Sequence, residues 1–343
     1  MFLTAQADRE RLPVALLTGF LGSGKTTLVN ALLGDPRMAG TAVAINEFGE
    51  VPIDHALIDQ GAERTVVMAN GCLCCNLAGD LDQAVMRLFA RRQSGELPRF
   101  ARLIIEPSGL ADPAPIAQAI LRNPLLSRAL RLEAIVATVD AQFAELQLAR
   151  HAETRKQMSL ADTLVLTKPD LIDHAAEISL REKLRALNPS APITVARHGA
   201  VDAAALFPAH FLDPSSAMPA RRSALSADDA AAPAGHLGGV ASVSLGADQP
   251  LRWRAFEAWL RGIRLAHADR LLRVKGLLNI DGRDGPVAVQ GIHHVVNVPV
   301  ALESWPGPDR RSWLVLIADP PTTAAARTSW ASALPAMMMP ARQ

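Results

Sequence analysis

The sequence predicts an α/β protein with a doubly wound, mostly parallel sheet and a second, smaller α+β domain. Short continuous apolar runs alternate with helical patterns up to residue 207. Such runs are typical of parallel strands that are buried on both faces. A segment rich in Ala, Pro, Ser, Asp and Gly follows over residues 208–239, and shorter strands around one amphipathic helix come after it. A chain of 343 residues has room for about two such domains.

In the first domain, residues 1–207, the apolar runs set the order of the elements. Helical patterns separate them, so we expect each strand to cross over to a parallel neighbour. The expected strands are residues 14–17, 42–45, 65–68, 103–105, 135–139, 164–166 and 193–195. The expected helices are residues 26–33, 77–92, 113–121 and 174–187.

The second domain, residues 240–343, is predicted to follow the linker at 208–239. It should contain strands near residues 240–245, 271–280, 287–298 and 313–317. A helix carries Trp253, Phe256 and Trp259 at helical spacing, which indicates core packing first and client docking second. The Ala- and Met-rich end is expected to form a closing helix, with helix and frayed chain both open after Pro335.

Charge and hydropathy exclude several classes of partner. Lys and Arg number 35 against 34 Asp and Glu, so the formal charge is +1. This balance argues against a nucleic-acid-binding surface and a polybasic membrane patch. No apolar run approaches the roughly 20 residues of a membrane helix, and the amino terminus lacks a secretory pattern. We expect a cytosolic protein, and the sequence is also compatible with a homo-oligomer.

A phosphate-binding loop follows the first apolar strand. Residues 19–26 read GFLGSGKT and fit G-x-x-x-x-G-K-[ST], between a predicted strand and a predicted helix. The glycines allow backbone N–H groups to surround phosphates, Lys25 reaches the outer phosphates, and the Thr26 hydroxyl binds Mg²⁺. The predicted nucleotide contacts in this loop are Gly19, Gly22, Ser23, Gly24, Lys25, Thr26 and Thr27.

Two further strand ends complete the predicted nucleotide site. Glu106 ends the strand at 103–105, where a carboxylate can address Mg²⁺ or the γ-phosphate; a simple turn cap is the alternative. Thr167, Lys168, Pro169 and Asp170 follow the strand at 164–166. The Asp170 carboxylate can accept two hydrogen bonds from guanine, and the Lys168 stem can cover the purine. An ordinary strand-to-helix turn is the alternative.

All three cysteines lie together, as Cys72, Cys74 and Cys75, in GCLCCN. This clustering excludes a disulfide framework and leaves metal binding, a redox pair or buried structural thiols. Soft thiolates favour Zn²⁺, Cu⁺ or Co²⁺ over Mg²⁺. Three sulfurs leave a tetrahedral site incomplete, which suits a metal that must leave.

The ordered motifs GFLGSGKTT, NEFGE, GCLCCN, EPSGLADP and TKPD resemble those of the CobW-type metallochaperone GTPases. RVKGLLNIDG, VQGIHHVVN and RRSWLVLIA are similar to that family's carboxyl-terminal domain, so the resemblance covers almost the entire chain. It implies slow GTP hydrolysis by Lys25, Thr26 and Glu106 with Mg²⁺, and zinc or cobalt at the Cys-x-Cys-Cys motif. The nucleotide state would control whether the metal is held or passed to a client protein.

The resemblance also implies that the NEFGE segment is a switch loop. Glu47 is the expected non-thiolate metal ligand, ahead of Glu50 and Asp54, and a solvated acidic loop is the alternative. Thr167 departs from the usual Asn of the guanine motif, which could loosen the base pocket. The linker has only His236 in place of a His-rich tract. His293 and His294 are expected to alternate across a strand rather than bind metal.

Two other functions remain open on sequence alone. A GTP-binding regulator could hold its metal permanently and signal by docking a partner. A P-loop kinase acting on a small metabolite would fit the phosphate loop, but it leaves the cysteines and the TKPD motif unexplained. The sequence does not distinguish zinc from cobalt, since thiolate sites follow the general affinity order of the metals.

Overall fold

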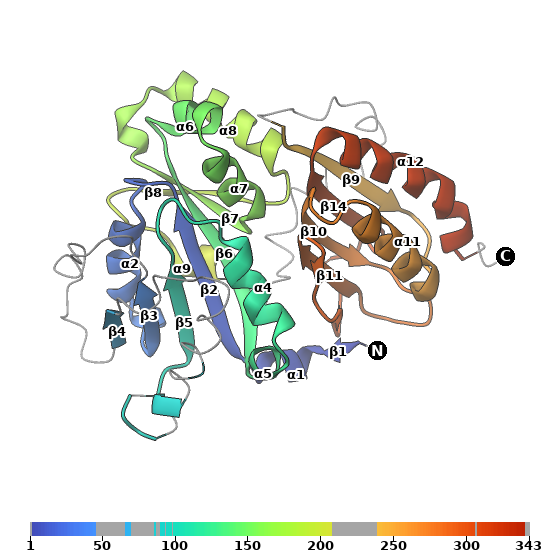
Figure 1. Ribbon diagram of the computed structural model, residues 1–343, viewed down its shortest axis with the longest axis horizontal. Helices are drawn as coiled ribbons and strands as arrows, with labels where there is room; N and C mark the ends of the chain where they lie inside the picture. Colours follow the sequence, from blue (N-terminus) through green and yellow to red (C-terminus); the bar gives the residue numbers. More distant parts are fainter. Residues whose placement is uncertain are drawn as a thin grey trace. The chain divides into compact units, whose positions relative to one another are not determined.

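The computed structural model describes residues 2–45, 66–69, 86, 90–92, 94–97, 99–207, 239–305 and 307–339. The chain forms two compact units (Figure 1). The parallel-sheet unit comprises Glu10–Arg181 and Ile193–Phe211; the antiparallel-sheet unit comprises Met1–Arg9, Glu182–Pro192 and Leu212–Gln343. Among the helices in the described ranges, none has the length and apolar character needed to cross a membrane.

The parallel-sheet unit confirms the predicted fold class. All neighbouring strands of its sheet are parallel, in the order β4-β3-β5-β2-β6-β7-β8. Each predicted apolar run overlaps one of these strands, and residue 65 of the run 65–68 lies outside the described residues. The strands are β2 (Leu12–Gly19), β3 (Thr41–Ile45), β4 (Val66–Ala69), β5 (Arg102–Glu106), β6 (Leu130–Asp140), β7 (Thr163–Thr167) and β8 (Ile193–Ala196).

Helices and short 3₁₀ turns connect these strands. They are α2 (Lys25–Leu33), η1 (Pro36–Met38), α4 (Ala114–Arg122), α5 (Pro124–Ala129), α6 (Ala144–Arg150), α7 (Ala152–Leu160), η3 (Pro169–Leu171), α8 (His174–Leu187) and α9 (Ala203–Leu206). The helices predicted at 26–33, 113–121 and 174–187 are confirmed, and most of the one at 77–92 lies outside the described residues. The sequence did not predict α5, α6, α7 or α9.

A core on one face of the parallel sheet holds the phosphate-loop helix in place. The apolar face of α2 and the segment of α9 pack against residues that alternate along the strands. The members of this core include Leu28, Val29, Leu32, Leu206 and Phe207, against Ala15, Leu17, Val43, Ile104, Val136 and Val165. The start of α2 is therefore fixed relative to the strand ends.

The antiparallel-sheet unit is built around a sheet in the order β1-β13-β11-β10-β14-β9, with β12 paired to β11. β1 runs parallel to β13, and the other pairs are antiparallel. The amino-terminal residues thus pair within this unit. Its elements are β1 (Leu3–Thr4), α1 (Ala5–Arg9), β9 (Ala241–Ala247), α11 (Trp253–Ala266), β10 (Leu271–Leu278), β11 (Val287–Ile292), β12 (Val295–Val296), β13 (Val300–Ala301), β14 (Ser312–Ala318) and α12 (Pro320–Met337).

One predicted strand of this unit is wrong. Residues 287–298 do not form a single strand, because β11 and β12 pair antiparallel across a tight turn made by His293 and His294. His293 has φ 52°, a left-handed conformation, and its N–H donates to Leu272 O at 3.0 Å. The two histidines therefore do not alternate across a strand. At the other end of the unit, α12 continues through Pro335 to Met337.

The aromatic residues of α11 contribute to the core, as predicted. Phe256 is fully buried, and Trp253 and Trp259 are partly buried against the same cluster as Trp330 of α12. The ring centroids of Trp259 and Trp330 are 4.8 Å apart in an edge-to-face arrangement. Trp259 Nε1 donates to Ser329 Oγ at 3.0 Å, so this packing joins the two helices.

Phe256→Ala should destabilise the antiparallel-sheet unit by about 3–5 kcal/mol, because it leaves a cavity in this core. All 5 tryptophans, at positions 253, 259, 305, 313 and 330, lie in this unit, so their fluorescence in urea measures its unfolding. Leu265→Ala is the control, since Leu265 is 78% exposed. Equal unfolding midpoints for the two variants would contradict this role of Phe256.

Candidate nucleotide site

The predicted phosphate loop connects the end of β2 to the start of α2. Gly22 has φ 72° and Gly24, the residue before α2, has φ 90°. These left-handed conformations favour glycine and turn successive backbone N–H groups towards one side. The first turn of α2 adds further N–H groups and the positive end of the helix dipole. The backbone is thus suited to bind an anion.

Two side chains of the loop, those of Lys25 and Ser23, stabilise it through hydrogen bonds to its backbone carbonyl groups. Lys25 is 9% exposed, and its Nζ donates to Gly19 O at 3.1 Å and Phe20 O at 3.3 Å. Ser23 Oγ donates to Phe20 O at 2.6 Å and lies 2.7 Å from Thr138 Oγ1 on β6. The Ser23 side chain therefore stabilises the loop, and the Ser23 backbone N–H also donates to Phe20 O, at 3.2 Å.

Thr26 and Thr27 begin α2, where Thr26 is partly buried and Thr27 is exposed. A turn after β8, around Gly199, approaches the same helix. Gly199 has φ 81°, and a Cβ there would lie 2.7 Å from Thr27 O. Only glycine fits this approach. This turn was not predicted from the sequence, although a glycine soon after a strand is a turn signal.

Glu106 lies where the sequence predicted, as the last residue of β5 at the carboxyl edge of the sheet. It is 2% exposed, and its Cα is in register with Ile45 at the end of β3. The loop after it reaches the phosphate loop, since a Cβ on Gly109 would lie 2.7 Å from Leu21 N. The glycine of the EPSG motif is thus required for this close approach.

A buried glutamine of α7 fixes this loop. Gln157 is 1% exposed, and its Nε2 donates to Gly109 O and to Ala111 O, both at 3.0 Å. Next to it, Lys156 pairs with Asp112 at 3.2 Å. α7 therefore determines the position of the segment after Glu106. Gln157 was not predicted from the sequence, because its helix α7 was not predicted.

Thr167 ends β7 and connects the TKPD motif to the phosphate loop. Its Oγ1 lies 2.8 Å from Ser23 O and 3.1 Å from Val139 O. A hydroxyl has one proton, so it donates to one of these carbonyls at a time. Thr167 thus keeps a direct contact with the phosphate loop, whereas an Asn amide would have two protons for the same purpose.

Lys168 is the second connection between the two motifs. It adopts a left-handed conformation with φ 52°, and its Nζ donates to Gly22 O at 2.8 Å and to Asp140 Oδ2 at 2.7 Å. Asp140 is 2% exposed, and its Oδ1 accepts from the N–H groups of Gln142 and Phe143. Asp170 lies exposed in η3, open to a base.

Asp140 is a site residue that the sequence analysis did not identify. It directly follows the apolar run 135–139, the same pattern that singled out Glu106. Its carboxylate holds the Lys168 ammonium and caps the next turn at the same time. The signal was therefore present in the sequence, but no motif drew attention to it.

The predicted thiophilic site lies outside the described residues, as do its members Cys72, Cys74, Cys75 and Glu47. Within the described part of the chain, no group of three or more His, Cys, Asp or Glu side chains could hold a metal ion. For Mg²⁺, the Thr26 hydroxyl and the Glu106 carboxylate are hard oxygen ligands of the kind this ion prefers. Thr26 and Glu106 therefore remain the residues predicted to address Mg²⁺ in the nucleotide site.

A parallel sheet with a glycine-rich loop between its first central strand and a helix defines a P-loop nucleotide-binding protein. Residues 13–195 match the family model described as CobW/HypB/UreG, nucleotide-binding domain. Residues 240–334 match that of the cobalamin synthesis protein cobW C-terminal domain. The chain belongs to the CobW/HypB/UreG family, with a CobW carboxyl-terminal domain.

Relatives with known names agree with this assignment. The zinc chaperone YjiA of Escherichia coli is 33% identical over 286 residues, which cover 83% of this chain and 87% of YjiA. The zinc-regulated GTPase metalloprotein activator 1 of Schizosaccharomyces pombe is 33% identical over 198 residues, 56% of this chain and 47% of that protein. The crystal structure of Zn(II)-bound YjiA GTPase superposes with a TM-score of 0.70 at 29% identity, covering 94% of this chain and 98% of YjiA.

Asp140→Asn should weaken GDP binding roughly fivefold, about 1 kcal/mol, because the half-exposed Lys168 loses its charged partner. Titration with a fluorescent GDP analogue measures this change. Glu177→Gln is the matched control, since Glu177 pairs with Arg181 on α8 and touches neither motif. An unchanged affinity in Asp140→Asn would exclude this role for the Asp140–Lys168 pair.

Gln157→Leu should slow GTP hydrolysis about tenfold, because two buried carbonyls lose their donor and the loop after Glu106 shifts. GDP affinity should change less than about twofold, since a residue remote from the base and phosphates does not bind the nucleotide. Single-turnover phosphate release separates the two effects. The control is Lys156→Met, which removes only the Lys156–Asp112 pair and should hydrolyse GTP at the normal rate. A normal rate in Gln157→Leu would disprove the role of Gln157 in positioning the loop after Glu106.

Proposed function

We propose that this protein is a GTP-hydrolysing metallochaperone that binds zinc through Cys72, Cys74 and Cys75. It transfers the metal to a client protein in a nucleotide-dependent way. Cobalt is the alternative metal, since thiolates accept both ions. The names of YjiA as a zinc chaperone and of the fission-yeast relative as a zinc-regulated activator support this proposal.

The observation that carries the proposal is the alignment of three strand ends. Ala69 of β4, Ile45 of β3 and Glu106 of β5 are register partners across the sheet. The chain continues from Ala69 to Cys72 and from Ile45 to Glu47. The thiolate segment and the switch segment therefore follow strands that end at the same edge of the sheet as β5.

This arrangement supports a mechanism in which the nucleotide gates the metal. Residues 22–27 and Lys25 bind the phosphates, and Asp170 and Lys168 bind guanine. A γ-phosphate orders the segment carrying Glu47, whose carboxylate then joins the cysteine thiolates around the metal. The thiols lose their protons when they bind the ion. After hydrolysis the Glu47 segment is released and the thiolates hold the metal less tightly.

Hydrolysis itself depends on the loop after β5. Bound Mg²⁺ would supply charge neutralisation at the β- and γ-phosphates. Glu106 positions a ligand or water molecule at the carboxyl edge, and Gln157 keeps the following loop against the phosphate loop. We identify no general base among the described residues. The resemblance to the CobW-type GTPases implies slow intrinsic turnover, and a client could supply an additional charged group.

Zinc affinity should depend on the nucleotide: tighter with a non-hydrolysable GTP analogue than with GDP, by at least about tenfold, a coupling of 1.4 kcal/mol. Competition with a chromophoric chelator measures the affinity in the apo, GDP and analogue states, for zinc and for cobalt. Cys74→Ser/Cys75→Ser should abolish the metal binding. Lys25→Ala should keep the apo-state affinity and lose the nucleotide dependence.

Equal zinc affinity in all three states would exclude the gated carrier. The protein would then be a GTPase with a permanently held metal. Normal zinc binding by the double cysteine variant would place the metal elsewhere in the chain.

A further inference from the structure

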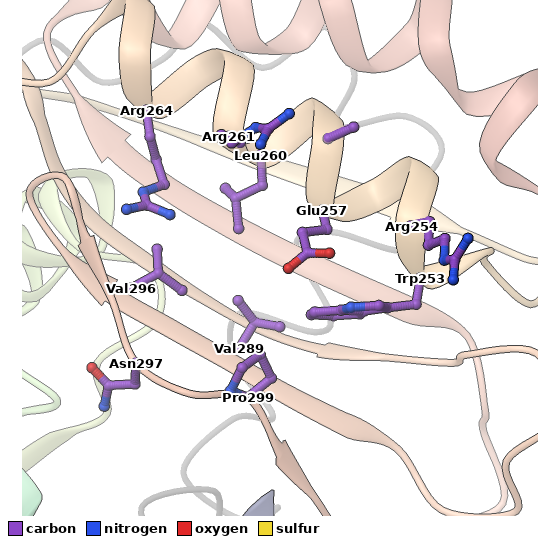
Figure 2. A pocket seen from close by; sticks show the side chains of 11 residues that line it. Trp253, Arg254, Glu257, Leu260, Arg261, Arg264, Val289, Val296, Asn297 and Pro299 are labelled. Carbon is purple, nitrogen blue, oxygen red and sulfur yellow. The ribbon is translucent and has the colours of Figure 1, made fainter. Parts of the chain in front are cut away.

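A hollow of about 370 Å³ lies between α11 and the strands of the antiparallel-sheet unit (Figure 2). All of its lining residues belong to this unit, and none belongs to the nucleotide site. Its size is at the lower end of the range of ligand pockets, about 300–1,000 Å³. It can hold a few side chains of a partner but not a whole helix.

The inner surface of the hollow is apolar. Leu260 points from α11 towards Val289 and Val296, and Pro299 and the indole of Trp253 close the far end (Figure 2). Leu260 is buried, whereas Val296 and Trp253 are only partly buried against the core. Apolar side chains that remain accessible at the base of a hollow favour an apolar occupant.

Two exposed apolar side chains extend this surface beyond the hollow. Leu265 is 78% exposed and Val298 is 60% exposed, the highest values for any large hydrophobic side chain in the described ranges. Leu265 follows the lining residue Arg264, and Val298 stands between the lining residues Asn297 and Pro299. The two most exposed hydrophobic residues thus adjoin the same hollow, which is typical of an interaction site.

The charges around the hollow are mainly positive. Arg254, Arg261 and Arg264 line it against a single carboxylate, Glu257. Arg264 is the most enclosed of the three. It donates from Nε to His294 O at 2.8 Å and also from Nη2 to the same oxygen, and partial burial lowers its pKa. A carboxylate that approaches Arg264 meets a guanidinium held in place and partly removed from water, where charged hydrogen bonds are strong.

We propose that this hollow, together with Leu265 and Val298, docks a short acidic and apolar segment of a partner protein. Leucine- or valine-like side chains enter between Leu260 and Val296, and an Asp or Glu carboxylate pairs with Arg264. Arg254 and Arg261, exposed on α11, favour further acidic residues in the segment. This docking does not depend on the thiolate site, and it applies whether or not the partner is the metal recipient.

Selection from a library of random dodecapeptides on the full-length chain, without metal or nucleotide, tests this inference. The enriched peptides should combine Leu, Ile, Val or Phe with Asp or Glu. The best peptide, labelled with fluorescein, should bind at least tenfold more weakly to Arg264→Glu. Leu265→Ser should weaken it at least threefold, and this exposed position keeps the test valid if Arg264→Glu does not fold. Arg310→Glu, an exposed arginine outside the hollow, should bind normally.

Three results would overturn the inference. One is that no peptide is enriched, or that the enriched peptides are basic or share no pattern. Another is that the best peptide binds Leu265→Ser and Arg264→Glu as tightly as the unaltered chain. The last is a concentration-dependent dimer that Leu265→Ser abolishes, because a second copy of the chain would then be the occupant of this surface.

Discussion

The parallel register of the sheet is the constraint on which the nucleotide site depends. Thr167 is in register with Asp140, Gly19 with Thr138, and Glu106 with Ile45. Four strands, β2, β5, β6 and β7, end in residues of the candidate nucleotide site, so main-chain hydrogen bonds between strands set the spacing of these residues. The same register extends to Ala69, so β4 ends at this edge of the sheet too.

Side chains then lock the phosphate and base motifs together. Thr167 contacts Ser23 O, and Lys168 joins Gly22 O to Asp140. A displacement of the TKPD motif would therefore also displace the phosphate loop. Thr167 stands where this motif commonly has Asn. Its hydroxyl has one donor proton instead of the two of an amide, but the contact with the phosphate loop is still made. Hydrogen bonds thus join the TKPD motif to the phosphate loop, whereas Gln157 holds the loop after Glu106.

Much of the parallel-sheet unit could be predicted, because strands buried on both faces appear as continuous apolar runs. α7 could not, since its buried face includes Thr154, Gln157 and Ser159 and therefore lacks an apolar period. The turn between β11 and β12 was missed because His293 adopts a left-handed conformation without the usual Gly or Asn. The phosphate loop was located by its motif and Glu106 by its position after an apolar strand, but Gln157 and Gly199 act through contacts distant in sequence. The cysteine site lies outside the described residues and stays a prediction.

The pairing of β1 with β13 has a consequence for how the chain is made. Leu3 and Thr4 leave the ribosome long before their partners Val300 and Ala301. Domains generally fold in the order in which they emerge. The parallel sheet can therefore form before β1 has a partner, and the antiparallel sheet gains this edge only after residues 300 and 301 have emerged. A cut in the chain between β8 and β9 would separate the antiparallel sheet from β1, a strand that belongs to it.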